Sequence, residues 1–260
     1  MTPNLTDWQQ LFRDRAHQQF PAKIARGVAA VGTRRAEGDV PELATLLRGA
    51  VVTRDHVDSG LLHALVELSF DTVLSVGAGQ GFGEYAQFFD NALRVIEELR
   101  RRGGATTALL LAAARFEAQL ANGNQRRREL IEQAVAAGLD DVERVKALLT
   151  LAKFHVDVSA YDRTRHVLGE CRRLIDTDTP PEYVVDVETT TGISHFYADP
   201  AVAATYFHRA IEAGHALLGE PGVRQAVAAA IHYLGRLAHY QGDQRSALQL
   251  YVGAEHLSDN

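Results

Sequence analysis

Residues 234–254 read LGRLAHYQGDQRSALQLYVGA. Apolar residues return every three or four positions on both sides of a central Gly-Asp step, which is the period of an α-helix. Glycine and aspartate are typical of a tight turn. The stretch therefore predicts two antiparallel helices joined by a short turn. Its key positions are Leu234–Gly235, Gly242–Asp243, Ala247, Tyr251 and Ala254.

Looser copies of the same turn recur along the chain. They stand at Gly38–Asp39, Gly83–Glu84, Gly123–Asn124, Ser159–Ala160 and Ala198–Asp199. Successive turns are on average about 41 residues apart, which indicates a repeated structural unit. Each interval holds two apolar-periodic segments of helical length, and alternating β-branched segments are nearly absent. We expect an all-α chain of about six stacked helical hairpins.

The punctuation between turns sets the predicted boundaries. Pro200 directly follows Asp199, an arrangement that suits the first position of a helix with a capping carboxylate before it. A solenoid domain is expected over 24–260, with hairpins at about 24–52, 55–102, 104–138, 140–176, 180–218 and 221–257.

A further helix is expected over 1–23, where an apolar stripe at Leu5, Trp8, Leu11 and Phe12 would cover the first end of the stack. Solenoids normally carry polar caps at both ends. No matching polar helix follows the last hairpin, so that end indicates either self-association into a homo-oligomer or a chain that continues into another domain.

The hairpins resemble tetratricopeptide repeats. The last copy matches that family's consensus sites at Leu234, Gly235, Ala238, Gly242, Asp243, Ala247, Tyr251 and Ala254. Earlier units carry looser matches, such as Ala203, Phe207 and Ala210 in the fifth. The resemblance implies a right-handed helical-hairpin solenoid. The units are longer than the usual 34 residues, and in this they look like the repeats that form sensor or scaffold portions of bacterial regulators.

In that family the binding residues line the concave face, on the first helix of each hairpin. The resemblance therefore implies a partner-binding groove at Arg35, Glu117, Lys153, Glu188, His195, His232, Arg236 and His239. The last three fall at i, i+4 and i+7, which makes one polar stripe on a helix. Together with Lys153 it would suit a carboxylate or phosphate. The alternative interpretation is the solvated face of an ordinary helix.

The predicted function is that of a scaffold or sensor module that binds a protein or peptide in this groove. Because the chain has neither a helix-turn-helix unit nor a phosphate loop of the G-x-x-x-x-G-K-[ST] form, a regulatory sensor would lack its own DNA-binding domain. Compaction on binding a small peptide would distinguish such a sensor from a passive scaffold.

A glycine-rich stretch supplies the one enzyme alternative. Residues 71–83, DTVLSVGAGQGFG, resemble motif one of S-adenosylmethionine-dependent methyltransferases. Such a loop requires an acidic residue after the next strand to bind ribose hydroxyls. Here an amphipathic helix at 84–102 follows, and then an Ala- and Leu-rich segment without a terminal acid. We interpret Gly77–Gly83 as an enlarged hairpin turn, with a contact loop or a methyltransferase-like enzyme as alternatives, and we predict no enzyme.

Charge and hydropathy argue against nucleic acid and membranes as direct partners. The formal net charge of -6 supplies no basic footprint for nucleic acid, and two arginine triplets, Arg100–Arg102 and Arg126–Arg128, are too isolated to reverse this. There is no apolar run near 18 residues and no charged-then-apolar leader. We therefore expect a cytoplasmic protein with a protein or peptide partner and no direct contact with nucleic acid or membrane.

Cysteine and histidine usage predicts no metal site and no cofactor. The single cysteine, Cys171, falls in an apolar pattern with Leu168 and Leu174, as a small core residue does. Among the eleven histidines, His232 and His239 are seven apart, too far for the i, i+4 arrangement of a helical zinc site. No G-x-S-x-G elbow or H-E-x-x-H occurs either.

Overall fold

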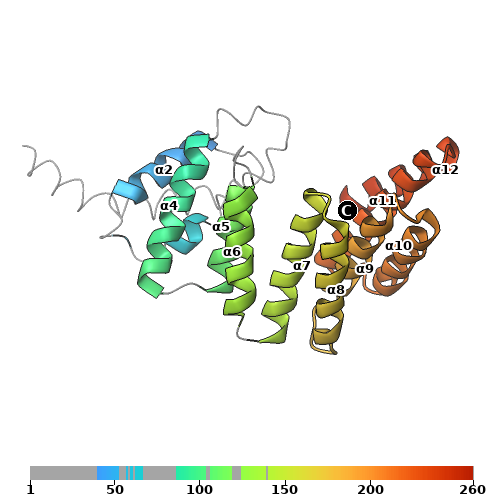
Figure 1. Ribbon diagram of the computed structural model, residues 1–260. Helices are drawn as coiled ribbons and strands as arrows, with labels where there is room; N and C mark the ends of the chain where they lie inside the picture. Colours follow the sequence, from blue (N-terminus) through green and yellow to red (C-terminus); the bar gives the residue numbers. More distant parts are fainter. Residues whose placement is uncertain are drawn as a thin grey trace, which may run out of the picture. The chain divides into compact units, whose positions relative to one another are not determined.

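The computed structural model describes residues 40–52, 57, 59–60, 62–66, 86–103, 106–118, 124–138 and 140–259 (Figure 1). Within these ranges the regular structure is α-helical and no strand occurs, which confirms the predicted all-α class for this part of the chain. The chain divides into two compact units, Met1–Leu130 and Ile131–Asn260. No helix of the described ranges combines the length and the apolar character that crossing a bilayer requires.

Several predicted features lie outside the described residues. They are the N-terminal helix over 1–23, Arg35, the Gly77–Gly83 loop and the turns at Gly38–Asp39 and Gly83–Glu84. The predicted domain and hairpin boundaries stay predictions.

The first unit is built around α4 (Ala86–Gly103), which packs against α2 (Val40–Val52) and α5 (Thr107–Glu117). The start of α6 (Asn124–Ala137) belongs to this unit as well. One face of α4 is buried along its length, at Phe88, Phe89, Ala92, Val95, Ile96 and Leu99. The apolar period of three to four residues explains why this segment is a helix with one side in the core.

A buried carboxylate organises the end of α4. Glu98 accepts hydrogen bonds from Arg101 at 2.6 Å and Arg102 at 2.8 Å. The bond from Arg101 is the main cause that holds the pKa of Glu98 at about 2, against burial, which raises it. Arg102 also donates to the Val57 carbonyl at 2.6 Å. These arginines thus stabilise the first unit internally.

The second unit contains three helical hairpins, drawn from yellow-green to red in Figure 1. They pair α7 (Asp141–Asp157) with α8 (Tyr161–Leu174), α9 (Pro181–His195) with α10 (Pro200–His215), and α11 (Pro221–Tyr240) with α12 (Gln244–Asp259). The first helices pack in series, α7 on α9 and α9 on α11. Each second helix also packs on the next first helix, α8 on α9 and α10 on α11. This is the stacking order of TPR-like hairpins.

Small residues set the close approach within two of these hairpins. A Cβ atom built on Gly192 of α9 would lie 2.5 Å from Cε1 of Phe207 in α10. A Cβ on Gly235 of α11 would lie 2.9 Å from Cε1 of Tyr251 in α12. Both glycines therefore make room for an aromatic ring of the second helix, which is the packing reason for the small-aromatic spacing in the sequence.

Acidic side chains begin one helix in each hairpin. Asp140 accepts a hydrogen bond from the Glu143 amide at 2.8 Å and so caps α7. Asp199 accepts one from the Val202 amide at 3.1 Å and caps α10, as the Asp199–Pro200 step predicts. Because the first amides of a helix have no partner inside it, these carboxylates determine where the helices start.

Two first helices end in the same backbone motif. Gly242 has φ +87°, and the Asp243 amide donates back to the Ala238 carbonyl at 2.9 Å. After α7, Ser159 takes the left-handed position with φ +57°, and the next amide donates to the His155 carbonyl at 2.7 Å. Glycine occupies this conformation without cost, whereas serine does not.

Apolar side chains hold neighbouring hairpins together. One cluster joins α9, α10 and α11 through Val185, Ala210, Val223, Ala226, Val227 and Ala230. A second joins the same helices near the turns through Phe196, Ala203, Phe207 and Leu237. Cys171 of α8 is fully buried, and burial raises the pKa of its thiol to about 12. It is a core residue, in agreement with its apolar pattern.

Candidate functional site

The predicted groove residues fall into different environments. Arg35 lies outside the described residues, and Glu117 is buried in the first unit with an ion pair to Arg126 at 3.0 Å. The other six lie in the second unit. They are Lys153 on α7, Glu188 and His195 on α9, and His232, Arg236 and His239 on α11.

Lys153 faces the next first helix. Its ammonium group lies 2.6 Å from the Asp186 carboxylate of α9, and about half of the lysine side chain is exposed. The pair links two consecutive first helices at their surface. An exposed pair of this kind contributes little to stability, and a ligand that used Lys153 would have to compete with Asp186.

Glu188 lies on another side of α9. Two helical residues apart means about 200° around the axis, so Glu188 points away from the Asp186 side. It accepts a hydrogen bond from Arg172 of α8 at 3.0 Å, and Arg172 also donates to Thr191 at 2.7 Å. The predicted groove therefore does not contain Glu188 and Lys153 on one face.

His195 also faces a second helix. Its ring stacks on Tyr206 of α10 with centroids 5.8 Å apart and planes 12° apart. Burial, followed by the charge of Arg165, lowers the pKa of His195. The ring is thus a neutral packing partner near pH 7 and not a cationic contact for an anion.

A set of aromatic residues that the sequence analysis did not single out lies where α9 and α11 end. Tyr197 and Tyr240 are each 60% exposed, and their rings meet edge to face at 6.0 Å. Both rings also contact the buried Phe196, at 5.0 and 6.0 Å. The Arg236 guanidinium lies 5.7 Å from the Phe196 ring centroid. We call Phe196, Tyr197, Arg236 and Tyr240 the tyrosine patch.

The sequence holds a signal for this patch. Tyr197 and Tyr240 each stand two or three residues before the aspartate of a turn, at Asp199 and Asp243. Aligning Gly192 with Gly235 places both tyrosines at one repeat position, because each stands five residues after its glycine. Whether the two rings would meet depends on how the hairpins stack, and a single repeat does not contain that information.

A pocket, which we call the turn pocket, opens beside Tyr197 at the turns between α7 and α8 and between α9 and α10. Its volume is about 520 Å³. Arg165 crosses it, donating to the Ser194 carbonyl at 2.9 Å and pairing with Asp162. The remaining lining comes from Ser159, Ala160, Tyr161, Arg163, Tyr197 and Ala198. Because Tyr197 belongs to both, the turn pocket and the tyrosine patch form one continuous surface.

The polar stripe predicted on α11 is present, and its residues are exposed. His239 Nδ1 lies 2.9 Å from Gln244 Oε1, and the His232 ring lies 5.2 Å from the ring of Tyr251. Burial, with a smaller effect of the Arg236 charge, lowers the pKa of His232. His232 is therefore less readily protonated, and His239 contacts Gln244, so Arg236 is the permanent cation of the stripe.

No group of three or more histidine, cysteine, aspartate or glutamate side chains in the described ranges is placed to hold a metal ion. The glycine loop at Gly77–Gly83 lies outside those ranges.

Comparison with known proteins yields structural likeness only. No family model and no curated protein matches the sequence. A crystal structure of MamA aligns with 69% of this chain and 95% of its own, at 13% identity and a TM-score of 0.43. A second crystal structure of MamA protein aligns with 68% of this chain and 88% of its own, at 13% identity and a TM-score of 0.42. A third solved structure, described as MamA MSR-1 C2, aligns with 67% of this chain and 89% of its own, at 19% identity and a TM-score of 0.35. At these values the likeness assigns neither family nor function.

Proposed function

We propose that the second unit is a protein-interaction module that binds a peptide segment of a partner across the tyrosine patch and the turn pocket. One observation carries the proposal. Tyr197 and Tyr240, both largely exposed, are held edge to face over the buried Phe196 with Arg236 beside them. These aromatic rings contact each other but leave apolar surface exposed to water, and an exposed apolar patch of this kind is typical of an interaction site.

The chemistry of the patch is that of an interaction hot spot. Tyrosine and arginine are the residue types that dominate binding energy at protein interfaces, together with tryptophan. Tyrosine offers a large contact area with few rotatable bonds, so little entropy is lost on binding. Contact with Phe196 restrains both tyrosine rings further before any partner arrives.

The charges around the patch favour a particular kind of peptide. Arg236 stands on one side of it, and Arg163 and Arg165 line the turn pocket on the other, with Asp162 as the acidic residue of that pocket. A segment that places an apolar side chain on the tyrosines and a carboxylate near an arginine would form charge-assisted hydrogen bonds. Of the residues predicted from the sequence, this proposal keeps Arg236 as a direct contact.

The test begins with capture of partners on the full chain from its source cells, followed by mass spectrometry. The affinity of the identified partner is then measured by calorimetry for the wild type, for the double variant Tyr197→Ala with Tyr240→Ala, and for Arg236→Ala. Loss of a hot spot of about 2 kcal/mol or more corresponds to at least about thirtyfold weaker binding.

The matched control is Leu217→Ala, which shortens an exposed apolar side chain just after α10, away from the patch. It should leave affinity unchanged. Partner binding that is as tight in the double tyrosine variant as in the control would rule out the tyrosine patch as the binding surface.

A further inference from the structure

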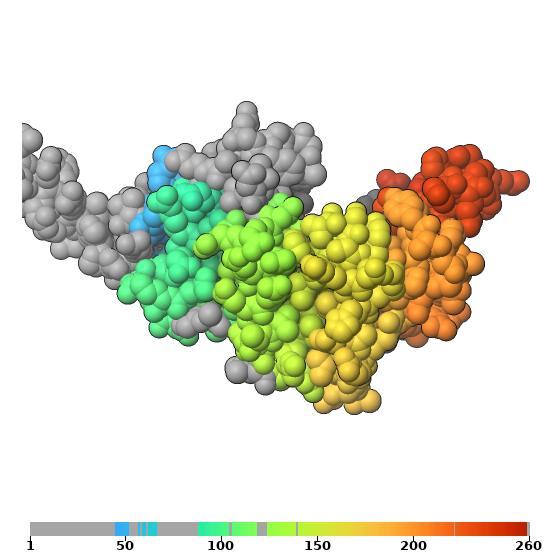
Figure 2. Space-filling model, viewed as in Figure 1, coloured from blue at the N-terminus to red at the C-terminus, as the bar shows by residue number. Residues whose placement is uncertain are grey.

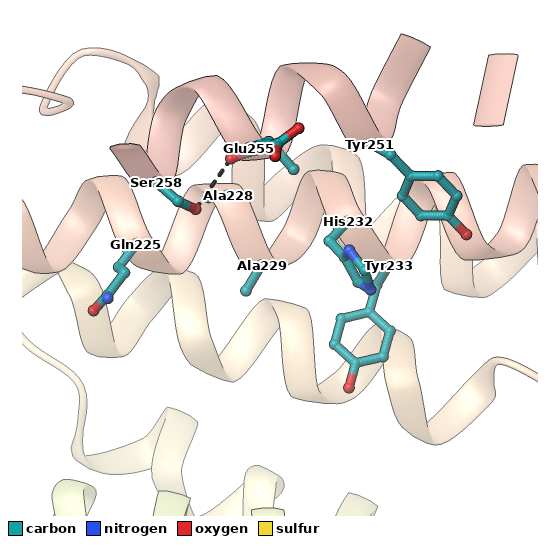
Figure 3. A pocket seen from close by; sticks show the side chains of 9 residues that line it. Gln225, Ala228, Ala229, His232, Tyr233, Tyr251, Glu255 and Ser258 are labelled. Carbon is teal, nitrogen blue, oxygen red and sulfur yellow. Dashed lines mark hydrogen bonds between the residues drawn. The ribbon is translucent and has the colours of Figure 1, made fainter. Parts of the chain in front are cut away.

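The last hairpin has a groove between its two helices on the side away from α9 and α10. The volume of the groove is about 620 Å³. Figure 3 shows that α11 contributes Ala228, Ala229 and His232 to it, while α12 contributes Tyr251 and Glu255. In Figure 2, α12 is drawn in red at the edge of the second unit.

The preceding hairpin, α9 with α10, can be aligned with the last hairpin residue by residue. Gly192 and Gly235 each face an aromatic ring of their own second helix, Phe207 and Tyr251, so the two hairpins superpose in sequence through these pairs. With this register, Val185 of α9 corresponds to Ala228 of α11. Ala210 of α10 corresponds in the same way to Ala254 of α12, which also lines the groove.

In the preceding hairpin the corresponding groove is filled by a helix. The occupant is α11, which inserts Val223, Ala226, Val227 and Ala230 against Val185 and Ala210. These four residues stand at i, i+3, i+4 and i+7, so they make one narrow apolar face. The fit is tight, because a Cβ on Gly214 of α10 would lie 2.3 Å from Cγ2 of Val227.

The second helices of the two hairpins, α10 and α12, carry corresponding residues on the groove side. On α10, Ala204 and Ile211 are partly buried because they pack against the clusters that contain α11. Their counterparts on α12 are Leu248 and Glu255. Leu248 is 65% exposed, the most exposed large apolar side chain among the described residues. It occupies a position that is covered by a helix in the preceding hairpin.

A carboxylate of the terminal groove matches the dipole of a helix that runs in the same direction as α11. The N-terminal end of α11 lies beside the Glu182 carboxyl, whose carbon would be 3.5 Å from a Cβ on Gly222. At the same end of the terminal groove stands Glu255. A carboxylate at a helix N-terminus is stabilising.

We propose that the groove between α11 and α12 binds an α-helix of a partner chain, which presents small apolar residues at i, i+3, i+4 and i+7. The helix lies parallel to α11, as α11 lies on α9 and α10. This inference deepens the proposed interaction function by assigning a second surface and the kind of partner that fits it.

A symmetric dimer in which the grooves of two copies of this chain face each other does not fit this surface. Two copies that met by this same surface in a symmetric dimer would each present a hollow to the other. Protein interfaces reach the packing density of interiors at their core, and two opposed hollows would leave the space between them unfilled. A convex helix with short side chains fills it.

The probe for the test is a lactam-bridged synthetic helix of about 20 residues, with Val, Ala, Val and Ala at i, i+3, i+4 and i+7 on a Glu, Lys and Gln background. The control probe has the same composition with the four apolar residues distributed around the helix. Binding to the full chain is followed by fluorescence anisotropy. Only the probe with the continuous apolar face should bind.

Two charge substitutions on α12 locate the site. Leu248→Glu lies on the groove side of α12, seven residues before the groove residue Glu255, whereas Gln249→Glu lies about 100° further around the helix and outside the groove. Both start from exposed side chains, so both variants should fold, which circular dichroism checks. Leu248→Glu should weaken the probe at least tenfold, and Gln249→Glu should bind as the wild type does. Equal effects of the two substitutions, or equal binding of both probes, would overturn the proposal.

The tyrosine double variant separates this site from the peptide surface. It should bind the helix probe normally, because Tyr197 and Tyr240 do not line the groove. A probe that fails to bind while the captured partner still depends on the tyrosines would refute the groove and leave the tyrosine patch standing. Dimerisation in analytical ultracentrifugation that Leu248→Glu abolishes would overturn the partner-helix assignment in favour of a second copy.

Discussion

Replacement of Gly192 by alanine should destabilise the second unit, although alanine is the better helix former. A Cβ atom at this position would lie 2.5 Å from Cε1, 2.7 Å from Cδ1 and 3.0 Å from Cζ of Phe207. Phe207 has no exposed surface and stacks on Tyr233 at 5.9 Å. Its ring therefore cannot move aside into solvent.

The expected magnitude follows from two opposing effects. Alanine in place of glycine inside a helix gains about 1 kcal/mol. Overpacking of a filled core costs about 1–3 kcal/mol, and the closest contact here lies well inside the distance that real Cβ atoms tolerate. With the upper end of that range, the free energy of unfolding should fall by about 2 kcal/mol.

Two other glycines give graded controls. Gly169 in α8 is exposed, and a Cβ there would meet no atom within 4 Å, so Gly169→Ala should raise the free energy of unfolding by about 1 kcal/mol. Gly235 faces Tyr251 at 2.9 Å, but that ring is half-buried and can shift toward the groove. Gain and cost should nearly cancel in Gly235→Ala.

Urea unfolding followed by far-ultraviolet circular dichroism measures all three variants against the wild type. The expected order of stability is Gly169→Ala, then Gly235→Ala, then Gly192→Ala, with about 3 kcal/mol between the extremes. Equal stability of Gly192→Ala and Gly169→Ala would refute the argument that the glycine exists to admit the Phe207 ring.

Three further predictions concern caps, turns and the buried thiol. Asp199→Ala removes the hydrogen bond to the Val202 amide and should lower the free energy of unfolding by about 1 kcal/mol, measured by urea unfolding. Ser159→Gly should stabilise by up to about 1 kcal/mol and Gly242→Ala should destabilise by about as much, because both positions have positive φ; thermal unfolding compares the pair. The thiol of Cys171 has a pKa of about 12 in the folded chain, against an ordinary value near 9.0. Above pH 9 this thiol therefore ionises only in the unfolded chain, and the free energy of unfolding should fall as pH rises, by up to about 1.4 kcal/mol per pH unit. Cys171→Ala should show a shallower decline.

The hairpins of the second unit could be predicted from local sequence. Ser159–Ala160, Ala198–Asp199 and Gly242–Asp243 were predicted as turns, and each lies between two helices in the structure. These features depend on residues within one or two helical turns of each other, through backbone conformation and capping. The contact between Gly235 and Tyr251 has the same short range, because both belong to one hairpin.

Only the tertiary structure decided which face of each helix remains free. Glu188 and His195 were expected in the groove, but they face α8 and α10, because the neighbours of a helix side come from other hairpins. The contact between Tyr197 and Tyr240 likewise joins two repeats, and it was not predicted. Sequence periodicity determines where side chains point around their own axis. The packing of hairpin on hairpin determines whether that direction leads to a core, a partner helix or solvent.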